Sequence, residues 1–321
     1  MRNMHRRSFH LRAVSVIIPA HNAAATIART LASLRPEADV IGEVLLVDDS
    51  SSDDTASVAE HAASRCALPL RVIQSNCRDA GGARNLALAQ ANYPWIYMID
   101  ADDLHLDGGL RSLLSRTDMQ TRADMVVGAF RRRTDGVDRQ IKLPVGYTAA
   151  STANASAYIQ GHVRSIAVGS ALVSRRAIDE TRFPTGLAYD EDTLFWAKVL
   201  STALLAVITQ PVMTYFVSAE RSDDRFTVKP AKRFLEWRQA LHGLADCGIA
   251  KSALKVREGL VALKIARVHY ARGDLDTAAR FLAVARAAPK VPSDTWRCMR
   301  YQFKLAARRR FSVPRIQLQS A

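Results

Sequence analysis

The chain has 321 residues, of which 48% are hydrophobic and 24% are charged. This length and composition exclude a disordered chain and a small disulfide-stabilised domain, and they indicate one large domain or two of moderate size. The formal net charge is +14, and eleven basic residues but no acidic residue lie in residues 1–13 and 295–321. The excess charge therefore belongs to the two ends, which either attract nucleic acid or an anionic membrane or only keep the ends solvated.

Two further features of the sequence indicate the cellular compartment of the protein. The four cysteines are scattered and form no Cys-x-x-Cys pair, which argues against a zinc site or a disulfide framework and favours a reducing cytoplasm. The N-terminus has no apolar segment after its basic residues, and the longest apolar span, 199–217, contains Gln210 and Pro211. We therefore expect neither secretion nor a membrane-spanning helix.

Strand-like and helix-like segments alternate along the first third of the chain. Short β-branched runs predict strands, and the alanine-rich segments after them predict helices. In chain order these pairs are Val14–Pro19 and Ala24–Leu34, Glu43–Val47 and Asp53–Ser64, Leu70–Ser75 and Gly82–Ala91, and Trp95–Ile99 and Asp107–Ser115. This alternation predicts a mainly parallel sheet with right-handed crossovers.

The rest of the chain changes character twice. We expect a strand at Asp124–Phe130, an irregular connection from Arg131 to about Ala157, and a block at 158–217 that packs on the same sheet. This block is expected to hold a helix through Val199 and a strand at Leu204–Ile208. Beyond Lys229 the pattern becomes helical, with helices expected at Ala231–Ala245, Ala250–Tyr270 and Leu275–Ala287.

Acidic residues follow two of the predicted strands. Asp48-Asp49 ends the second strand, and Asp100-Ala101-Asp102-Asp103 ends the fourth. Ligands bind at the carboxyl ends of strands in open α/β sheets. Because hard divalent cations prefer carboxylate oxygens and share their other sites with phosphates and water, we predict a metal site with Asp102 as a ligand. The alternative, an acidic turn that caps the next helix, explains one aspartate but not three.

The carboxylates after the second strand have two readings. One carboxylate of Asp48-Asp49 can accept hydrogen bonds from a base or ribose, as acidic residues at strand ends do for nucleotides. The alternative is that Ser52 or Asp53 caps the next helix and Asp48 satisfies amides of the loop.

Polar residues also follow the first strand and open the third helix. Pro19 should end the first strand, because proline cannot donate a sheet hydrogen bond, and His21 and Asn22 then lie on a rim loop. The segment Gly81-Gly82-Ala83-Arg84-Asn85 lacks the glycine spacing of dinucleotide binding and the lysine of a P-loop. Its glycines still permit close backbone approach, and Arg84 either binds a phosphate or base as a forked donor or is a surface arginine.

A third acidic group, Glu191-Asp192, precedes the apolar segment Thr193-Leu194-Phe195-Trp196. Apolar surroundings can raise the pKa of a carboxylate toward the working pH, which suits a general base. The alternative is that both acids only favour the positive end of a helix dipole.

Five segments taken in chain order resemble the family 2 inverting glycosyltransferases, which have the glycosyltransferase-A fold. They are V-S-V-I-I-P-A-H-N, L-L-V-D-D-S-S-S-D-D-T, G-G-A-R-N-L-A-L, Y-M-I-D-A-D-D and R-F-P-T-G-L-A-Y-D-E-D-T-L-F. The resemblance covers about residues 14–217. It implies an α/β, Rossmann-like glycosyltransferase-A domain with a mainly parallel mixed sheet. It also implies transfer of a sugar from a nucleotide-diphosphate sugar, expected to be a UDP-sugar, to an acceptor hydroxyl with Mg²⁺ or Mn²⁺.

By this resemblance Asp49 binds the nucleobase of the donor and Asp102 binds the metal. Asp192 acts as the catalytic base that accepts a proton, with Glu191 as the other candidate for that role. The other expected nucleotide-sugar contacts are Pro19, His21, Asn22, Asp48, Arg84, Asp100 and Ala101, and Asp103 is expected beside the metal. His21 departs from the family, which often has tyrosine there. The base would take the acceptor proton as the acceptor oxygen attacks the sugar from the face opposite the diphosphate, which inverts the anomeric centre.

This interpretation divides the chain into a basic arm at 1–13, a catalytic domain at 14–225 and a helical basic extension at 226–321. Residues 14–115 would be the nucleotide-binding half and residues 116–225 the acceptor half. We expect a cytoplasmic enzyme that makes polysaccharide or another glycan on a glycan or lipid-linked acceptor. Phe303, Leu305 and Phe311 near the C-terminal arginines suggest contact with an anionic membrane at its inner face.

Two other classes compete with this interpretation. A nucleotidyltransferase also uses clustered carboxylates and a metal, but it needs a basic signature near its first strand, and residues 19–27 contain no lysine or arginine. A nucleic-acid-binding protein would act through the basic ends and leave the acidic groups unexplained. We therefore do not expect nucleic acid as the partner.

Overall fold

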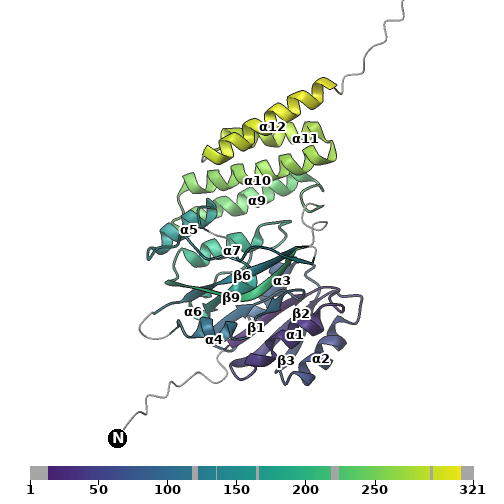
Figure 1. The fold of residues 1–321 in the computed structure, drawn as a ribbon, viewed down its shortest axis with the longest axis vertical. Helices are drawn as coiled ribbons and strands as arrows, with labels where there is room; N and C mark the ends of the chain where they lie inside the picture. The colour runs from purple at the N-terminus through teal and green to yellow at the C-terminus, as the bar shows by residue number, and fades with distance from the viewer. Residues whose placement is uncertain are drawn as a thin grey trace, which may run out of the picture. The chain divides into compact units, whose positions relative to one another are not determined.

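The computed structural model describes residues 14–117, 122–134, 136–163, 166–217, 224–289 and 292–311. The chain divides into two compact units, Met1–Ala219 and Glu220–Ala321, called here the sheet unit and the helical unit. Figure 1 shows a sheet with surrounding helices in the first and helices in the second. The predicted basic arm at 1–13 lies outside the described residues. None of the helices in the described ranges is long and apolar enough to cross a membrane.

The described strands of the sheet unit form one sheet. In chain order they are β1 (Val14–Ala20), β2 (Ile41–Asp49), β3 (Leu70–Ser75), β4 (Trp95–Met98), β5 (Leu104–His105), β6 (Met125–Thr134), β7 (Val137–Asp138), β8 (Ala171–Ser174) and β9 (Leu205–Val217). Their spatial order is β3-β2-β1-β4-β8-β6-β9-β5, with β7 paired to β6. The sheet is parallel from β3 to β4, whereas β8 runs antiparallel to both of its neighbours and β5 antiparallel to β9.

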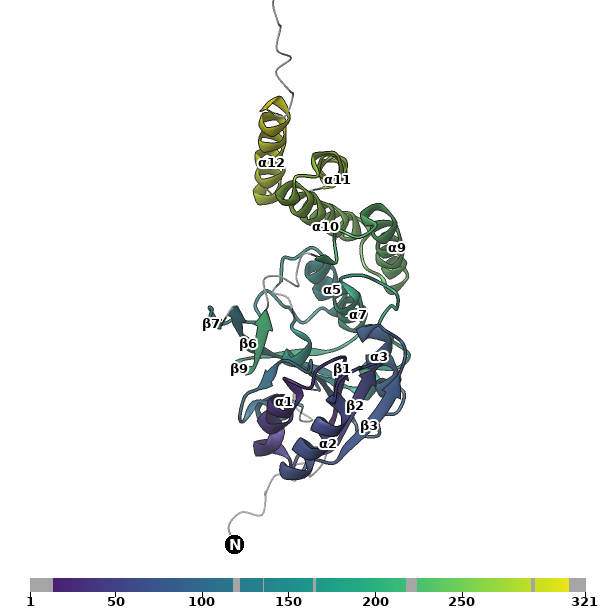
Figure 2. The ribbon, with the colours of Figure 1, turned by 90° about the vertical axis from the view of Figure 1, so that its right-hand side faces the viewer.

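Helices connect these strands. In the sheet unit they are α1 (Ile27–Leu34), η1 (Arg35–Glu37), α2 (Thr55–Arg65), α3 (Ala80–Leu88), α4 (Gly109–Leu114), α5 (Ser151–Ile159), η2 (Val168–Ser170), α6 (Arg175–Ile178) and α7 (Glu191–Leu200). Figure 2 shows α1 and α2 on one face of the parallel strands and α3 on the other. Strands covered on both faces are expected to carry continuous apolar runs, as β1 does at 16–18 and β2 at 44–47.

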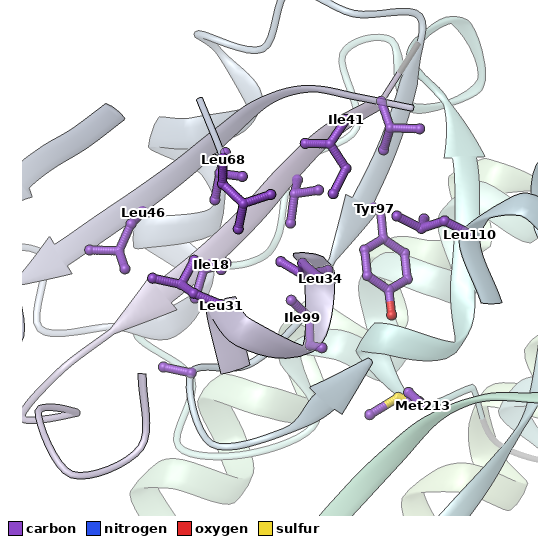
Figure 3. Close-up of a cluster of buried hydrophobic side chains, with 14 of the residues drawn as sticks. Ile18, Leu31, Leu34, Ile41, Leu46, Leu68, Tyr97, Ile99, Leu110 and Met213 are labelled. Atoms are coloured by element: carbon purple, nitrogen blue, oxygen red, sulfur yellow. The ribbon is translucent and has the colours of Figure 1, made fainter. Parts of the chain in front are cut away.

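The core of the sheet unit forms where α1 packs on the parallel strands. Leu31 and Leu34, three residues apart on one face of α1, are fully buried and point toward strand side chains such as Ile18 and Tyr97 (Figure 3). Complete burial of an aliphatic side chain of this size contributes roughly 1.5–3 kcal/mol. This packing fixes β1, β2 and β4 relative to one another, and therefore also the loops at their carboxyl ends.

Buried polar residues that come before and after the acidic segment following β4 form one cluster. His105 Nε2 lies 2.6 Å from Glu37 Oε1, and His105 Nδ1 lies 3.1 Å from the hydroxyl of Tyr97. The Tyr97 hydroxyl donates to the carbonyl of Gly169 at 2.8 Å, and burial raises the pKa of Tyr97 well above its usual value. Since Tyr97 precedes the acidic segment and His105 follows it, this cluster ties the two ends of that segment together.

The helical unit contains α9 (Pro230–Gly243), η3 (Leu244–Cys247), α10 (Lys251–Arg272), α11 (Leu275–Ala287) and α12 (Pro292–Phe311). Its core includes Phe234, which contacts the rings of both Trp237 and Phe281. Gly273, with φ of +85°, ends α10, and Asp274 caps α11 by accepting a hydrogen bond from the Thr277 amide.

One expectation for the elements is wrong. The segment from Arg131 to Ala157 is not an irregular connection, because it contains the end of β6, β7 and α5. Its strands are largely exposed, so they lack the apolar alternation that predicts a strand. The helical extension expected at the basic end is confirmed, since α12 covers 292–311 and buries Cys298 and Leu305.

The last strand is also longer than expected. A strand was predicted at Leu204–Ile208, and β9 runs from Leu205 to Val217 through Pro211. The pairing of β6 with β9 shifts register on both sides of Ala129, which is the partner of Pro211. Such an irregularity accommodates a residue that has no amide hydrogen to donate.

Candidate nucleotide and metal site

Three loops of the candidate site meet at one edge of the sheet because β1, β2 and β4 are parallel neighbours. Ala20 pairs with Asp48, and Ile17 pairs with Met98. The residues that follow these strands therefore leave the sheet on the same side, as expected for ligand-binding loops of an α/β sheet.

Asp49 lies buried at the end of β2 in a ring of donors. Its Oδ1 accepts hydrogen bonds from the Ser75 hydroxyl at 3.1 Å and the Arg78 amide at 3.0 Å, and its Oδ2 accepts from the Asp79 amide at 2.8 Å. His21 Nδ1 donates to the carbonyl of Asp49 at 2.7 Å. A carboxylate has about four lone-pair sites, so the three donors among the described residues leave room for one more.

Asp48 and the rim of β1 complete this side of the site. Asp48 is buried, its Oδ2 accepts from Gln74 at 3.3 Å, and its Oδ1 has no hydrogen-bond partner among the described residues. Asn22 has a left-handed backbone with φ of 50°. The backbone amide of Asn22 donates to Ser51 Oγ at 2.9 Å, and its side-chain Oδ1 accepts from the Ser52 backbone amide at 2.8 Å. These two hydrogen bonds connect the loops after β1 and β2.

Arg84 connects two of the acidic groups. It is buried on α3, donates through Nη2 to Asp100 Oδ1 at 2.7 Å and has Nη1 3.6 Å from Glu191 Oε1. Its guanidinium also lies over the ring of Phe183, 5.2 Å from the centroid. Burial lowers the pKa of Arg84, but the charges of Asp100 and Glu191 outweigh this effect and raise the pKa above its usual value. Arg84 is therefore a permanent cation between the two carboxylates.

The arginine also has unused hydrogen-bonding capacity. Its Nε and Nη1 are buried and have no hydrogen-bond partner among the described residues. Such groups are rare in native proteins, because an unmade buried hydrogen bond costs free energy. Arg84 can therefore donate to one further anionic or carbonyl oxygen.

The acidic segment after β4 is held from α1 through its backbone. The Thr30 hydroxyl lies 2.9 Å from the carbonyls of both Ala101 and Asp103, and Arg29 donates to the carbonyl of Asp102 at 2.8 Å. This arrangement leaves Asp102 exposed and Asp103 buried.

Asp102 and Asp103 differ in what they can bind. Asp103 Oδ1 accepts from the Phe216 amide at 2.9 Å, and burial, followed by the charge of Asp100, raises its pKa to about 9. Among the described residues no three His, Cys, Asp or Glu side chains are grouped to hold a metal ion. The exposed carboxylate of Asp102 fits a divalent cation that takes its other ligands from phosphates and water. The carboxyl of Asp103 is buried and already accepts the Phe216 amide, so it is less accessible to such a cation than that of Asp102.

A loop that precedes α7 carries the third acidic group, and α3 holds this loop in place. Asn85 exchanges two hydrogen bonds of 2.8 Å with the backbone of Phe183, and the Gly186 amide donates to Asp79 Oδ2 at 2.9 Å. The rings of Phe183 and Phe195 stack with centroids 3.8 Å apart, which joins the loop to α7.

The first residues of α7 have a defined geometry. Asp190 has a left-handed backbone with φ of 66°, a conformation that aspartate tolerates better than most residues. Glu191 and Asp192 then lie in the first turn, where the helix dipole favours negative charge. Asp192 Oδ1 accepts from the Thr193 amide at 2.7 Å.

The sequence-based reasoning missed three residues that hold the site together, namely Asp79, Asn85 and Arg29. Asp79 stands directly before the start of α3, and an aspartate there signals a helix cap. Its bond to Gly186 spans 107 residues of chain. No local signal could have revealed that bond or the one from Arg29 to Asp102.

A sheet with a parallel half, acidic loops after the two strands on either side of β1, and a mixed second half is typical of the glycosyltransferase-A class of folds. The chain belongs to the family described as glycosyl transferase family 2, whose model matches residues 15–182. The family and the fold expected from the sequence are confirmed.

The chain is similar to two characterised bacterial proteins over parts of its length. It is 42% identical over 114 residues to the succinoglycan biosynthesis protein ExoU of Rhizobium meliloti (strain 1021), over 35% of this chain and 33% of that protein. It is 25% identical over 203 residues to the Escherichia coli UDP-Glc:alpha-D-GlcNAc-diphosphoundecaprenol beta-1,3-glucosyltransferase WfaP, over 63% of this chain and 76% of that protein. The chain matches about a third of the length of ExoU and of the related ExoO.

Solved structures share the fold. Residues 1–349 of S. aureus TarS, crystallised with UDP-GlcNAc, superpose with a TM-score of 0.61 at 17% identity, covering 93% of this chain and 91% of that one. The mannosyltransferase PcManGT from Pyrobaculum calidifontis, in complex with GDP-Man and Mn²⁺, gives a TM-score of 0.57 at 21% identity, covering 94% and 83%.

Proposed function

We propose that this protein is a glycosyltransferase that moves a sugar from a nucleotide-diphosphate sugar to an acceptor hydroxyl. The observation that carries the proposal is the buried Arg84, which pairs with Asp100 and Glu191 and has unused hydrogen-bonding capacity for a diphosphate. The names of its relatives, succinoglycan biosynthesis for ExoU and a UDP-Glc donor for WfaP, favour a UDP-sugar donor and polysaccharide biosynthesis.

The nucleotide is proposed to lie across the ends of β1 and β2. Asp49 has one acceptor position left for an N–H of the base, and Asp48 Oδ1 is a second buried acceptor without a partner in the described ranges. Pro19, His21 and Asn22 form the rim. We therefore assign residues 14–115 to donor binding, 116–225 to the acceptor and 226–321 to the helical extension.

The metal is proposed to be Mg²⁺ or Mn²⁺ beside the diphosphate. Asp102 would hold it, with Asp100 and Ala101 in the same loop, and Asp103 supports the loop through Phe216 rather than binding the ion. When bound, the cation supplies charge neutralisation, so that the diphosphate can leave without being protonated.

Asp192 is proposed as the catalytic base of an inverting transfer. Glu191 is the weaker candidate, because a proton taken by it would break its ion pair with the buried Arg84. Asp192 follows it in the first turn of α7, held by the Thr193 amide. It would accept the proton of the acceptor hydroxyl while the sugar is attacked from the face opposite the diphosphate.

The acceptor is proposed to be a glycan or a lipid-linked saccharide, since the names of WfaP and its relative WfgD specify a diphosphoundecaprenol acceptor. A lipid-linked acceptor lies in a membrane, and the net charge of +14 suits an anionic surface. We therefore extend the proposal to a cytoplasmic enzyme in peripheral contact with the inner face of that membrane. On α12, Trp296 and Phe303 are exposed, whereas Leu305, expected to join them, is buried.

A donor screen tests the proposal. The full chain is incubated with UDP-, GDP- and dTDP-sugars, with Mg²⁺, Mn²⁺ or a chelator, and melting temperature and sugar release are measured. We expect one UDP-sugar to raise the melting temperature and to be hydrolysed slowly, in both cases only with the cation. Release of pyrophosphate from a nucleoside triphosphate would instead identify a nucleotidyltransferase. Salt-sensitive retardation of RNA or DNA without any donor effect would identify a nucleic-acid-binding protein.

A further inference from the structure

The end of β6 and the chain after it form a hairpin, called here the basic hairpin and defined as residues 130–145 without residue 135. Phe130 and Lys142 exchange backbone hydrogen bonds of 3.1 and 2.9 Å, and Arg133 pairs with Asp138. Gly136, with φ of +77°, lies in the turn. Figure 2 shows β7 at the margin of the sheet unit, beyond the labelled part of β6. The hairpin is therefore an ordered projection from the sheet.

Its side chains combine aliphatic surface with positive charge. Val137 is 54% exposed, Ile141 42%, Leu143 39% and Val145 44%. The basic hairpin as defined also contains five basic residues and one acidic residue, a net charge of +4. Scattered exposed aliphatic residues need no explanation, but four within nine residues of one hairpin mark an interaction surface.

Phe216 of β9 links the basic hairpin to the acidic segment of the candidate site. Phe216, which pairs with Arg133 across β6 and β9, donates its amide to Asp103. The guanidinium groups of Arg29 and Arg133 lie over the ring of Phe216, at 4.4 and 5.9 Å from its centroid. Whatever covers the hairpin is therefore brought next to the site itself.

We infer that the basic hairpin docks on the surface of an anionic phospholipid bilayer and so holds the site at the membrane. The charge favours anionic headgroups, and the aliphatic side chains can enter the boundary between headgroups and acyl chains. A nucleic-acid surface would instead present aromatic side chains for stacking, and the four most exposed apolar residues here are aliphatic. The inference rests on the proposed membrane contact but not on the assignment of metal or base.

Vesicle co-sedimentation of the full chain tests this inference. The vesicles are neutral phosphatidylcholine, with or without phosphatidylglycerol. We expect the wild type to bind only the anionic vesicles, and Val137→Ser/Ile141→Ser to bind them roughly tenfold more weakly, because two aliphatic contacts are lost. The matched control is Leu204→Ser/Val207→Ser on another part of the sheet unit, where the side chains are 48% and 38% exposed. This control should bind like the wild type.

A second pair of variants tests the charge. Arg131→Gln/Arg139→Gln should weaken binding to anionic vesicles and reduce the dependence of this binding on salt. The control is Arg65→Gln/Arg280→Gln, which removes the same charge from two other exposed positions and should weaken the binding less. Sugar release from the donor in solution without vesicles should be unchanged in all four double variants, which shows that they remain folded.

The outcomes separate the two proposals. If the wild type does not bind anionic vesicles, membrane contact itself is overturned, while sugar release still reports on the transferase. If the hairpin variants bind like the wild type and Trp296→Ser/Phe303→Ser on α12 does not, the hairpin is not the docking surface. A dimer in sedimentation velocity that disappears with Val137→Ser/Ile141→Ser would assign the hairpin to a second copy of the chain and overturn the inference.

Discussion

The two halves of the sheet unit differ in strand direction and in the surface that they expose. Apart from the short β5, the strands of residues 14–115 are parallel, and the carboxylate of Asp49 at the end of β2 is matched by donors from the same half. Residues 116–217 contain strands of both directions, a register shift in β9 and the exposed basic hairpin. In our proposals the first half binds the donor, whereas the second presents surface to a partner outside the molecule.

Arg84 and Asp79 join these halves. Arg84 pairs with Asp100 in the first half and with Glu191 in the second, and Asp79 caps α3 while holding Gly186 of the later loop. In the proposed reaction, groups from both halves must be correctly positioned relative to each other. Variants in each half should therefore separate donor binding from turnover.

The largest effect is expected from Asp192→Asn. Loss of a general base should lower turnover by roughly 10²–10⁴-fold, and donor affinity should stay nearly unchanged because Asp192 belongs to the second half. The measurement is kcat with a saturating acceptor, together with donor affinity from calorimetry. Glu191→Gln is the companion variant, and a larger loss of kcat there than in Asp192→Asn would make Glu191 the base. Full activity in Asp192→Asn refutes the assignment.

Asp102→Ala is expected to lower turnover less than Asp192→Asn does, but to weaken donor binding strongly. It should reduce metal-dependent affinity for the nucleotide sugar at least about 10- to 100-fold, the cost seen when even a supporting group of a metal ligand is lost. Calorimetry with Mn²⁺ and with a chelator measures this affinity. Asp107→Ala removes another exposed carboxylate just beyond the segment and serves as the control. Equal affinities for the wild type and Asp102→Ala would contradict the metal assignment.

The smallest effect compares two helix caps. Asp79→Ala and Asp274→Ala each remove a carboxylate that caps a helix, so each should lower stability by about 1 kcal/mol. Only Asp79 also holds the loop that precedes Asp192, so only Asp79→Ala should raise the KM for the acceptor. Denaturant unfolding and steady-state kinetics measure the two effects. Identical kinetics in both variants would show that Asp79 is only a cap.

The predictability of the fold follows the same division. The strands and helices of residues 14–115 could be predicted closely, because burial on both faces gives continuous apolar runs and the turns carry proline, glycine and capping residues. Beyond residue 115 the strands of the basic hairpin escaped prediction, since exposure removes the apolar pattern. The helical extension at 226–321 was expected, but the bounds of α12 were not predicted, because most of its described positions face solvent and only a few, such as Cys298 and Leu305, are buried.

The site shows a similar limit. Its acidic groups could be found from their places after strands, and the position of Asp49 and the Asp100 segment at the same edge of the sheet follows from the parallel direction of the strands. The pairing of Arg84 with Glu191 and the burial of Asp103 could not be found, because both depend on contacts more than a hundred residues apart in the chain. The sequence indicates which residues carry charge, and tertiary packing decides which of them remains accessible.

The polar cluster of Glu37, His105 and Tyr97 has an evolutionary consequence. Removal of the imidazole would strand a fully buried carboxylate with only the amides of Leu110 and Arg111, and an uncompensated buried charge is strongly destabilising. Positions 37 and 105 should therefore be inherited as a pair. In an alignment of homologous chains, those that have lost the histidine are expected to have replaced the glutamate as well.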